Sequence, residues 1–513
     1  MNKLNSLVDI LRYPLKILFV GYIMLGLGLF LQNDNFAVFY TITNPILVIT
    51  SEFMVEVGAF IVRNFPLFFL IKYVSRKTNS YIPILMAIIG YATFLIATMI
   101  FASSDLPSYL FSNILNISYN RLELFSEPSL RYPIQTGLIS ALIVGACTKL
   151  AYKLTRRRKN LSYSLMEQDT LGIIVVVILS ALCGILVAYS WSYVYDALDI
   201  LYEFITLQFL QPSGMWIYGF LERLLALFGL SELIREPFWY GINGGAWTTF
   251  SGEVIVGDVN IWGAMQSANI VSSGFGRLIS PYYVMNIFIY PAILIGFYSL
   301  YTDIKARAKR WLVLIFLIIT SILLGALVPL ELVMLFLCPL LLFVHYCLVG
   351  SIFSILSYFS ANLGFVFEGN TAIALPGTLF DYAIHLRNPD IFPKLTTIAI
   401  VGIIYFVIYY ILVNLYFKYM AFDIFQSGKV NNTVSLFQEI IGGYDNVEKI
   451  SATPFKLIVK VRNIEAVNKE RLFDLGTKRV VESNNEFNIH LGQKSTIIYR
   501  AILKSRKKME GTI

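Results

Sequence analysis

Acidic side chains inside apolar stretches are the residues whose type and position could do chemistry in this sequence. Glu331 lies within the long apolar stretch 323–350, and Asp381 follows the Gly- and Pro-containing segment "PGTLF". A charged side chain at membrane depth is costly and usually serves a function, so both carboxylates are candidate solute ligands. For each of them, a helix-capping or structural acid is the alternative.

An aromatic side chain in a Gly-rich segment is a second candidate. Trp247 lies in "GINGGAWTTFSGE" and could present a stacking face to a ring-shaped solute. The signal is weak, because Phe, Trp and Tyr make up 15% of the chain.

Metal-binding and redox patterns do not emerge from the sequence. Each cysteine lies in an apolar run, where thiols usually serve as packing residues. The histidines are far apart, and none of them forms a zinc-binding pattern. We therefore expect no metal and no cofactor. The residues concerned are Cys147, Cys183, Cys338, Cys347, His345, His385 and His490.

The composition is that of a membrane protein. Hydrophobic residues make up 57% of the 513 residues and charged residues 14%, and the mean hydropathy is +0.68. A soluble protein would carry nearer ~25% charge. The net charge of +8 comes from Lys and Arg concentrated in loops, as the positive-inside rule expects. No basic helix or aromatic platform accompanies the charge, so we expect a lipid bilayer and no nucleic acid as partner.

The apolar runs fall into two blocks separated by a mixed region, 192–280. "QPSG", "GINGGAW" and "SGE" interrupt this region. Irregular backbone at membrane depth is tolerated where it lines a cavity, and such breaks point to a transport site. An ordinary extramembrane loop is the alternative. The predicted fold is an all-α membrane bundle of about ten spans plus re-entrant hairpins. The runs lie near 13–31, 54–74, 80–101, 133–152, 171–191, 281–300, 311–328, 331–350 and 396–416.

Basic loops set the predicted orientation. Lys and Arg cluster at 72–77, 153–159 and 305–310, so these loops are expected in the cytoplasm together with both termini. A cytoplasmic C-terminus then requires one further crossing within 351–395.

The composition of the chain changes from apolar to polar after Met420. Residues 433–513 are polar and predict a small α+β domain, with the alternating "PFKLIVKVRN" as one strand. The segment 465–476 predicts a second helix in this domain. We expect a linker over 426–432 before it.

Four separated motifs resemble those of bacterial sugar phosphotransferase permeases of the glucose–maltose–N-acetylglucosamine group, in the same order. The segment "IYGFLERLLALFGLSELIREPF" from Ile217 is similar to that group's "YGF-x-ER", "FGLHH" and "PF". "LLGALVPLELVM" from Leu323 is similar to "GITEPIEF", and "PGTLFDY" from Pro376 is similar to "GLIDF". The tail resembles the IIB domain attached to such permeases.

The resemblance implies a membrane-embedded IIC domain over 1–425 and a cytosolic IIB-like domain over 433–513. The first block, 1–192, would be scaffold and homodimer interface, and the second, 193–425, would hold the sugar site. The resemblance also implies a bacterial cell membrane, and phosphotransferase or regulatory proteins as partners of the tail.

The resemblance also locates chemistry that the tail lacks. A working IIB domain carries a cysteine that takes phosphate and passes it to the sugar, and that position is Thr453 here. A threonine hydroxyl keeps its proton at neutral pH, whereas a thiolate is readily formed and is a good leaving group. The arginines that would hold the phosphate map to Lys456, a remnant of the cradle, and to Ile458.

The membrane part also lacks residues that the family uses for phosphoryl transfer. The family's histidine pair falls on Ser231 and Glu232, and the glutamate of "GITEP" falls on Val328. In the family these groups hydrogen-bond the sugar hydroxyl that is phosphorylated. Glu232 joins Trp247, Glu331 and Asp381 as a candidate for substrate binding, and no catalytic residue is expected.

Three functions compete. The first is a degenerate sugar permease that binds or conducts a small solute, with a carbohydrate as one candidate, without phosphorylating it. The second is a phosphotransferase permease that is active through a partner's IIB domain. The third is a membrane sensor or assembly protein that uses its tail to dock partners.

Overall fold

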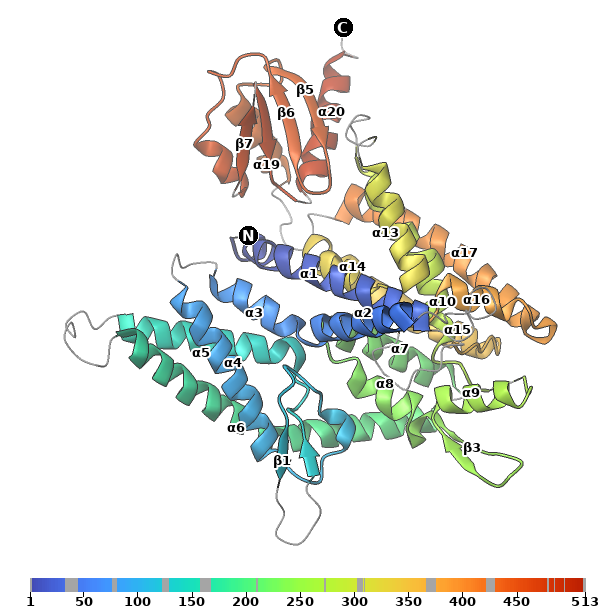
Figure 1. Ribbon diagram of the computed structural model, residues 1–513. Coiled ribbons are helices and arrows are strands. Elements are labelled where there is room, and N and C mark those ends of the chain that lie inside the picture. Colours follow the sequence, from blue (N-terminus) through green and yellow to red (C-terminus); the bar gives the residue numbers. More distant parts are fainter. Residues whose placement is uncertain are drawn as a thin grey trace.

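The protein is described by a computed structural model of two helical blocks followed by a small sheet-containing domain (Figure 1). The hairpins β1–β2 and β3–β4 lie on the side of the helical bundle opposite the C-terminal domain. The structure describes residues 2–32, 45–75, 81–121, 129–156, 168–208, 211–271, 274–301, 308, 310–365, 375–420, 430–477, 479–483, 485–492 and 494–510.

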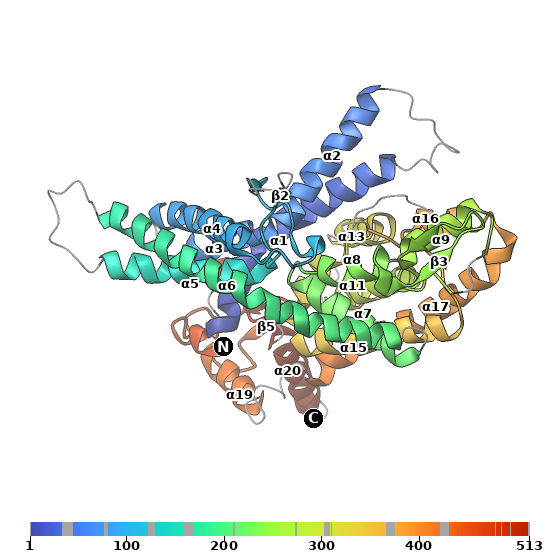
Figure 2. The ribbon, with the colours of Figure 1, turned by 90° about the horizontal axis from the view of Figure 1, so that it is seen from below.

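The first block contains long apolar helices and one short hairpin. The hairpin pairs β1 with β2 in antiparallel register. Helix α6 runs along α4 and α5, and its C-terminal end reaches α7 of the second block (Figure 2). The elements are α1 (Asn2–Gln32), α2 (Pro45–Arg63), α3 (Phe65–Ser75), α4 (Ile82–Phe101), β1 (Tyr119–Arg121), β2 (Ser129–Arg131), α5 (Gly137–Arg156) and α6 (Gln168–Leu207).

The single span expected over 54–74 is wrong, because the chain breaks at Asn64. The Asn64 side-chain amide donates to the Phe60 carbonyl oxygen at 2.8 Å, and its Oδ1 accepts the Leu115 N–H at 2.9 Å. A side chain that bonds nearby backbone competes with the helical hydrogen-bond ladder. Pro66 lacks an N–H and suits the start of the next helix. The break turns the chain at Arg63, which faces the pocket described below.

The second block contains shorter and more irregular helices. Pro339 begins α15 directly after α14, so the single span expected over 331–350 is also two helices. The elements are α7 (Pro212–Leu227), α8 (Glu232–Trp239), β3 (Ala246–Thr248), β4 (Val254–Val256), α9 (Asp258–Ser267), α10 (Ser280–Val284), the π-helical turn η4 (Met285–Ile289), α11 (Tyr290–Ser299), α13 (Trp311–Leu324), α14 (Val328–Leu337), α15 (Pro339–Tyr358), α16 (Leu379–His385), α17 (Phe392–Leu415) and η6 (Tyr416–Met420).

Among the described residues, eight helices are long and apolar enough to cross a membrane, and three further apolar helices are shorter. The sequence predicted about ten spans by counting apolar runs of membrane length. The difference includes the run 311–328, which forms the 14-residue α13 and counts among the shorter helices. In the segment 351–395, where a crossing was expected, the described part holds the end of α15, the seven-residue α16, the 3₁₀ turn η5 (Pro389–Ile391) and the start of α17. Residues 366–374 of that segment lie outside the description.

The C-terminal region is a four-stranded antiparallel sheet with helices at its two sequence ends. Its own apolar core is separate from that of the membrane helices. The helix expected over 465–476 is wrong: the chain there forms only the 3₁₀ turn η7 (Arg471–Leu475). The expected linker at 426–432 lies partly outside the described residues, and its last residues begin α19. The elements are α19 (Val430–Ile441), β5 (Val447–Ala452), β6 (Leu457–Val461), β7 (Val480–Ser483), β8 (Glu486–Ile489) and α20 (Lys494–Glu510), with strand order β5-β6-β8-β7.

Candidate functional site

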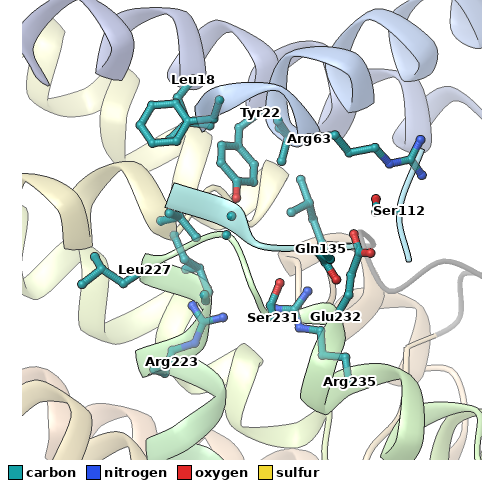
Figure 3. A pocket seen from close by; sticks show the side chains of 18 of the residues that line it. Leu18, Tyr22, Arg63, Ser112, Gln135, Arg223, Leu227, Ser231, Glu232 and Arg235 are labelled. Carbon is teal, nitrogen blue, oxygen red and sulfur yellow. The ribbon is translucent and has the colours of Figure 1, made fainter. Parts of the chain in front are cut away.

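A pocket lies where elements of both blocks meet (Figure 3). Three of the positions mapped onto the family's chemistry, Ser231, Glu232 and Val328, line it together. The prediction confined the site to the second block, but α1, α2 and the segment before α5 form one wall. The pocket is lined by Leu18, Tyr22, Val62, Arg63, Phe65, Pro66, Ser112, Ile114, Gln135, Gly137, Arg223, Ala226, Leu227, Gly229, Ser231, Glu232, Arg235, Tyr282, Gly325, Leu327, Val328, Leu375 and Pro376.

The turn between α7 and α8 brings Ser231 and Glu232 to the pocket. Gly229 adopts φ +73°, which glycine reaches without strain, and the chain reverses there into α8. Gly137 of the first block packs on this turn so closely that an added Cβ would lie 2.1 Å from the Phe228 carbonyl oxygen. The Leu138 N–H donates to the same oxygen at 2.9 Å. The first block thus holds the turn in place.

Another part of the lining comes from the turn between α13 and α14. Helix α13 ends at Gly325, which is left-handed at φ +62°, and Val328 begins α14. The buried Asn286 donates its side-chain amide to the Pro376 carbonyl oxygen at 2.8 Å and to that of Gly377 at 3.1 Å. These bonds hold the segment with Leu375 against the same turn. Val328 therefore presents an apolar side chain to the pocket, beside a backbone segment that the hydrogen bonds of Asn286 hold in place.

A buried cluster of charges borders the pocket, and two of its members, Arg223 and Arg235, belong to the lining. Arg223 donates to both oxygens of Glu222, from Nε at 2.5 Å and from Nη2 at 2.8 Å. Arg235 donates to Glu222 at 2.8 Å from the next helix, and Arg223 Nη1 reaches Glu331 Oε1 at 3.2 Å. The carboxylates are fully buried and the arginines nearly so. Since these two acids and two bases balance, the cluster is formally neutral, which limits the cost of burying it.

Sequence reasoning missed most of this cluster. It singled out Glu331, but not Glu222, Arg223 or Arg235, although all three lie in the segment that carries the first motif. These three charged residues within a short apolar segment could have indicated a buried cluster, because charges at membrane depth usually pair with one another. The guanidinium group of Arg235 also lies 4.7 Å from the ring centre of Trp239, a cation–π contact that holds its plane.

Glu331 lies behind Arg223 and is absent from the pocket lining. Its Oε1 accepts the Tyr290 hydroxyl at 2.5 Å and lies 3.5 Å from His345 Nε2. His345 Nδ1 lies 2.7 Å from the Tyr409 hydroxyl. These contacts gather four helices around one carboxylate oxygen, so Glu331 orients Arg223 from behind.

Two other candidates lie away from the pocket lining. Asp381 forms a capping box with Thr378 at the start of α16, with the Asp381 N–H donating to Thr378 Oγ1 at 3.3 Å. This is the helix-capping arrangement that the sequence left open as the alternative. Trp247 lies on β3, opposite Ile255 of β4, in a hairpin. Neither side chain takes part in the pocket lining.

Thr453 lies in the turn between β5 and β6 of the C-terminal domain. Its buried hydroxyl oxygen accepts the N–H of Lys456 at 3.0 Å and that of Phe455 at 3.3 Å. Lys456 Nζ donates to Asn488 Oδ1 at 2.6 Å. Burial lowers the pKa of Lys456, and Arg310 acts in the same direction while Glu486 opposes it. The hydroxyl is held by its own turn, and the amine by a neighbouring amide.

No group of His, Cys, Asp and Glu within the described ranges could hold a metal ion. The family comparison agrees with the helical architecture. The model of the phosphotransferase system EIIC family matches residues 8–350, which is more than half of the 513 residues. The matched region contains α1, the pocket turn between α7 and α8, Val328 and the charge cluster. Multiple apolar helices long enough to cross a bilayer fit the same assignment. The chain belongs to the phosphotransferase system EIIC family of integral membrane sugar permeases.

Proposed function

We propose that this protein binds a carbohydrate or a similar small solute in the pocket between its two blocks and moves it across the membrane without phosphorylating it. One observation carries the proposal: Val328 lines the pocket together with Ser231 and Glu232. The resemblance puts the family's glutamate at Val328 and its histidine pair at the other two positions. The polar groups that would activate a sugar hydroxyl are therefore replaced at one site.

The chemistry of the replacement supports loss of phosphoryl transfer. A valine side chain accepts no hydrogen bond, so it cannot draw a proton from a sugar hydroxyl. Leaving that hydroxyl without a partner costs about 1–3 kcal/mol, which weakens the bound state that transfer would require. Arg223, Arg235 and Tyr22 still offer hydrogen-bond donors to a solute. Binding groups thus survive where activating groups do not.

The C-terminal domain supports the same proposal. We infer that residues 433–513 form a IIB-like domain without its reactive thiol. The hydroxyl of Thr453 is buried in its turn, and an alkoxide would be a far poorer leaving group than a thiolate. Pro454 has no N–H to offer a phosphate, and Ile458 has no charge.

The assembly and orientation belong to the same proposal. We infer a homodimer through the first block, in a bacterial cell membrane, with the N- and C-termini in the cytoplasm. The apolar outer face of α6, which exposes Ile178, Leu182 and Leu186, suits either lipid or a second copy. Crosslinking in native membranes that yields only monomers would remove the dimer from this proposal.

The direct test is uptake into vesicles that contain the purified protein. Glucose, maltose and N-acetylglucosamine are offered with and without a reconstituted phosphorelay, and the internal sugar is analysed chemically. We expect unmodified sugar inside, at the same rate in both conditions. Relay-dependent release of sugar phosphate would refute the proposal and favour activity through a partner's IIB domain. No uptake of any solute would refute the transport part.

A matched pair of variants ties uptake to this pocket. Val328→Trp adds a bulky side chain to the pocket lining and should abolish uptake. Val333→Trp is the control, because Val333 is also half-buried on α14 and does not line the pocket. Equal uptake by both variants would show that the solute takes another path.

A further inference from the structure

Three carboxylates lie in the pocket lining or behind it, and they differ in their partners. Glu222 is paired with Arg223 and Arg235, and Glu331 is paired with Arg223. Glu232 forms no ion pair within the described ranges, although it lines the pocket. A carboxylate paired with arginine strongly resists protonation, whereas an unpaired one in a poorly solvated site takes up a proton more readily. Glu232 is therefore the carboxylate of this site that can change its charge.

The amide of Gln135 lies beside Glu232 and suits both of its charge states. Gln135 is Glu232's hydrogen-bond neighbour, and its buried Oε1 has no hydrogen-bond partner. An amide N–H can donate to a carboxylate, and an amide oxygen can accept from the O–H of a carboxylic acid. Figure 3 shows Glu232 beside Gln135.

The other titratable and charged groups around Glu232 come from several helices. Arg63, on α2, and Arg235, on α8, act on it electrostatically, and Glu236 is its like-charged neighbour one turn along α8. From the other walls, α7 contributes Arg223, α1 contributes Tyr22 and α10 contributes Tyr282. Asp258, on α9, accepts the N–H groups of Gly276 and Leu278.

We propose that Glu232 takes up and releases a proton in step with the solute, so that the permease is driven by a proton gradient. The inference rests on the proposed function, because a permease that does not phosphorylate its solute needs another source of energy to accumulate it. In the step, a carboxylate oxygen of Glu232 forms an O–H bond with a proton from water on one side. The same bond breaks to release the proton to water on the other side, and no electrons change hands.

The proton also couples to the solute through the pocket's charge. Protonation removes the negative charge of Glu232 beside Arg63 and Arg235, and it turns a pure acceptor into a donor. The bound solute therefore meets a different hydrogen-bonding pattern in each state, which is the differential affinity that coupling requires. At one proton per solute, each pH unit across the membrane supports about tenfold accumulation.

The test uses vesicles containing the full chain, with the sugar that the uptake assay above identifies and with the membrane voltage clamped by valinomycin and potassium. Glu232→Gln keeps the size and polarity of the side chain and removes the titration. Glu236→Gln is the matched control, because Glu236 lies one turn away on the same helix and does not line the pocket. An inward proton gradient of one pH unit is imposed.

We expect about tenfold accumulation by the wild type and by Glu236→Gln, and mere equilibration by Glu232→Gln. Accumulation by Glu232→Gln would overturn the inference. Uptake by the wild type that ignores the gradient would overturn it as well, while leaving the proposed function standing. Absence of any uptake would overturn both.

A second measurement tests the inference if the Glu232→Gln protein binds the sugar but does not transport it. Sugar affinity is measured in detergent between pH 5 and 8. The inference requires wild-type affinity to change across this range and the affinity of Glu232→Gln to stay constant. The same pH dependence in both proteins would overturn it.

Discussion

Replacing Glu222 by Gln tests whether the buried charge cluster holds the pocket together. Glu222 accepts hydrogen bonds from Arg223 at 2.5 and 2.8 Å and from Arg235 at 2.8 Å, and its side chain is fully buried. The substitution keeps the volume and removes the charge. Arg223 then keeps its ion pair with Glu331, and Arg235 loses the one with Glu222. Breaking a buried pair by removing one partner costs about 3–5 kcal/mol. We expect Glu222→Gln to lower the free energy of unfolding by that amount.

The assay is denaturant titration in detergent micelles followed by tryptophan fluorescence. Trp239 reports locally, because it stacks against Arg235. Glu236→Gln is the control, since Glu236 forms no ion pair in the described part of the chain, and it should change the unfolding free energy by less than about 0.5 kcal/mol.

A double variant separates pairing from burial. Glu222→Gln combined with Arg235→Gln restores the charge balance, so its loss should be smaller than the sum of the single losses by about 1–3 kcal/mol. Additive losses, or a cost of Glu222→Gln no larger than that of the control, would show that the cluster does not carry the stability of the site.

Three further predictions concern the pocket turn, the capping box and the tail. Gly137→Ala places a Cβ 2.1 Å from the Phe228 carbonyl oxygen at a position with φ +52°, so unfolding should become easier by about 2 kcal/mol or more in the same titration. Asp381→Ala removes the acceptor of Thr378 and should cost about 0.5–2 kcal/mol, measured in the same way, whereas no change would contradict the capping assignment. Thr453→Ala should leave uptake unchanged and Thr453→Cys alone should not create sugar phosphorylation, both followed with radioactive phosphate from the relay; label that passes from Thr453 to a sugar would contradict the proposed function.

The membrane class was predictable from sequence because it depends on local composition. A bilayer demands about 20 consecutive apolar residues per helix, and that demand is visible in any window of the chain. The family assignment was predictable for the same reason, since the motif around Glu222 and that around Glu331 are continuous segments. The strand β6 followed from the alternation of apolar and polar residues in "PFKLIVKVRN", which reflects a sheet with one buried face.

Predictions from local helix propensity were wrong where tertiary contacts determined the backbone conformation. The apolar run 54–74 contains Asn64 and Pro66, which disfavour one continuous helix, and the break at Asn64 also involves a hydrogen bond to Leu115, 51 residues away. The segment 465–476 has the apolar spacing and final glycine of a helix. It nevertheless packs as the short 3₁₀ turn η7 beside α19.

The site itself came from the tertiary structure. Arg223 and Glu331 are 108 positions apart, and the pocket wall that carries Arg63 and Gln135 comes from a block expected to be only scaffold. The sequence alone could single out Glu331, because the free-energy cost of placing a charged side chain in lipid depends on that one residue and its apolar neighbours. The distances between helices determine which carboxylate forms an ion pair and which one stays able to gain or lose a proton. Pairing energy falls with separation, so only the packed bundle assigns Glu222 and Glu331 to arginines and leaves Glu232 facing the pocket.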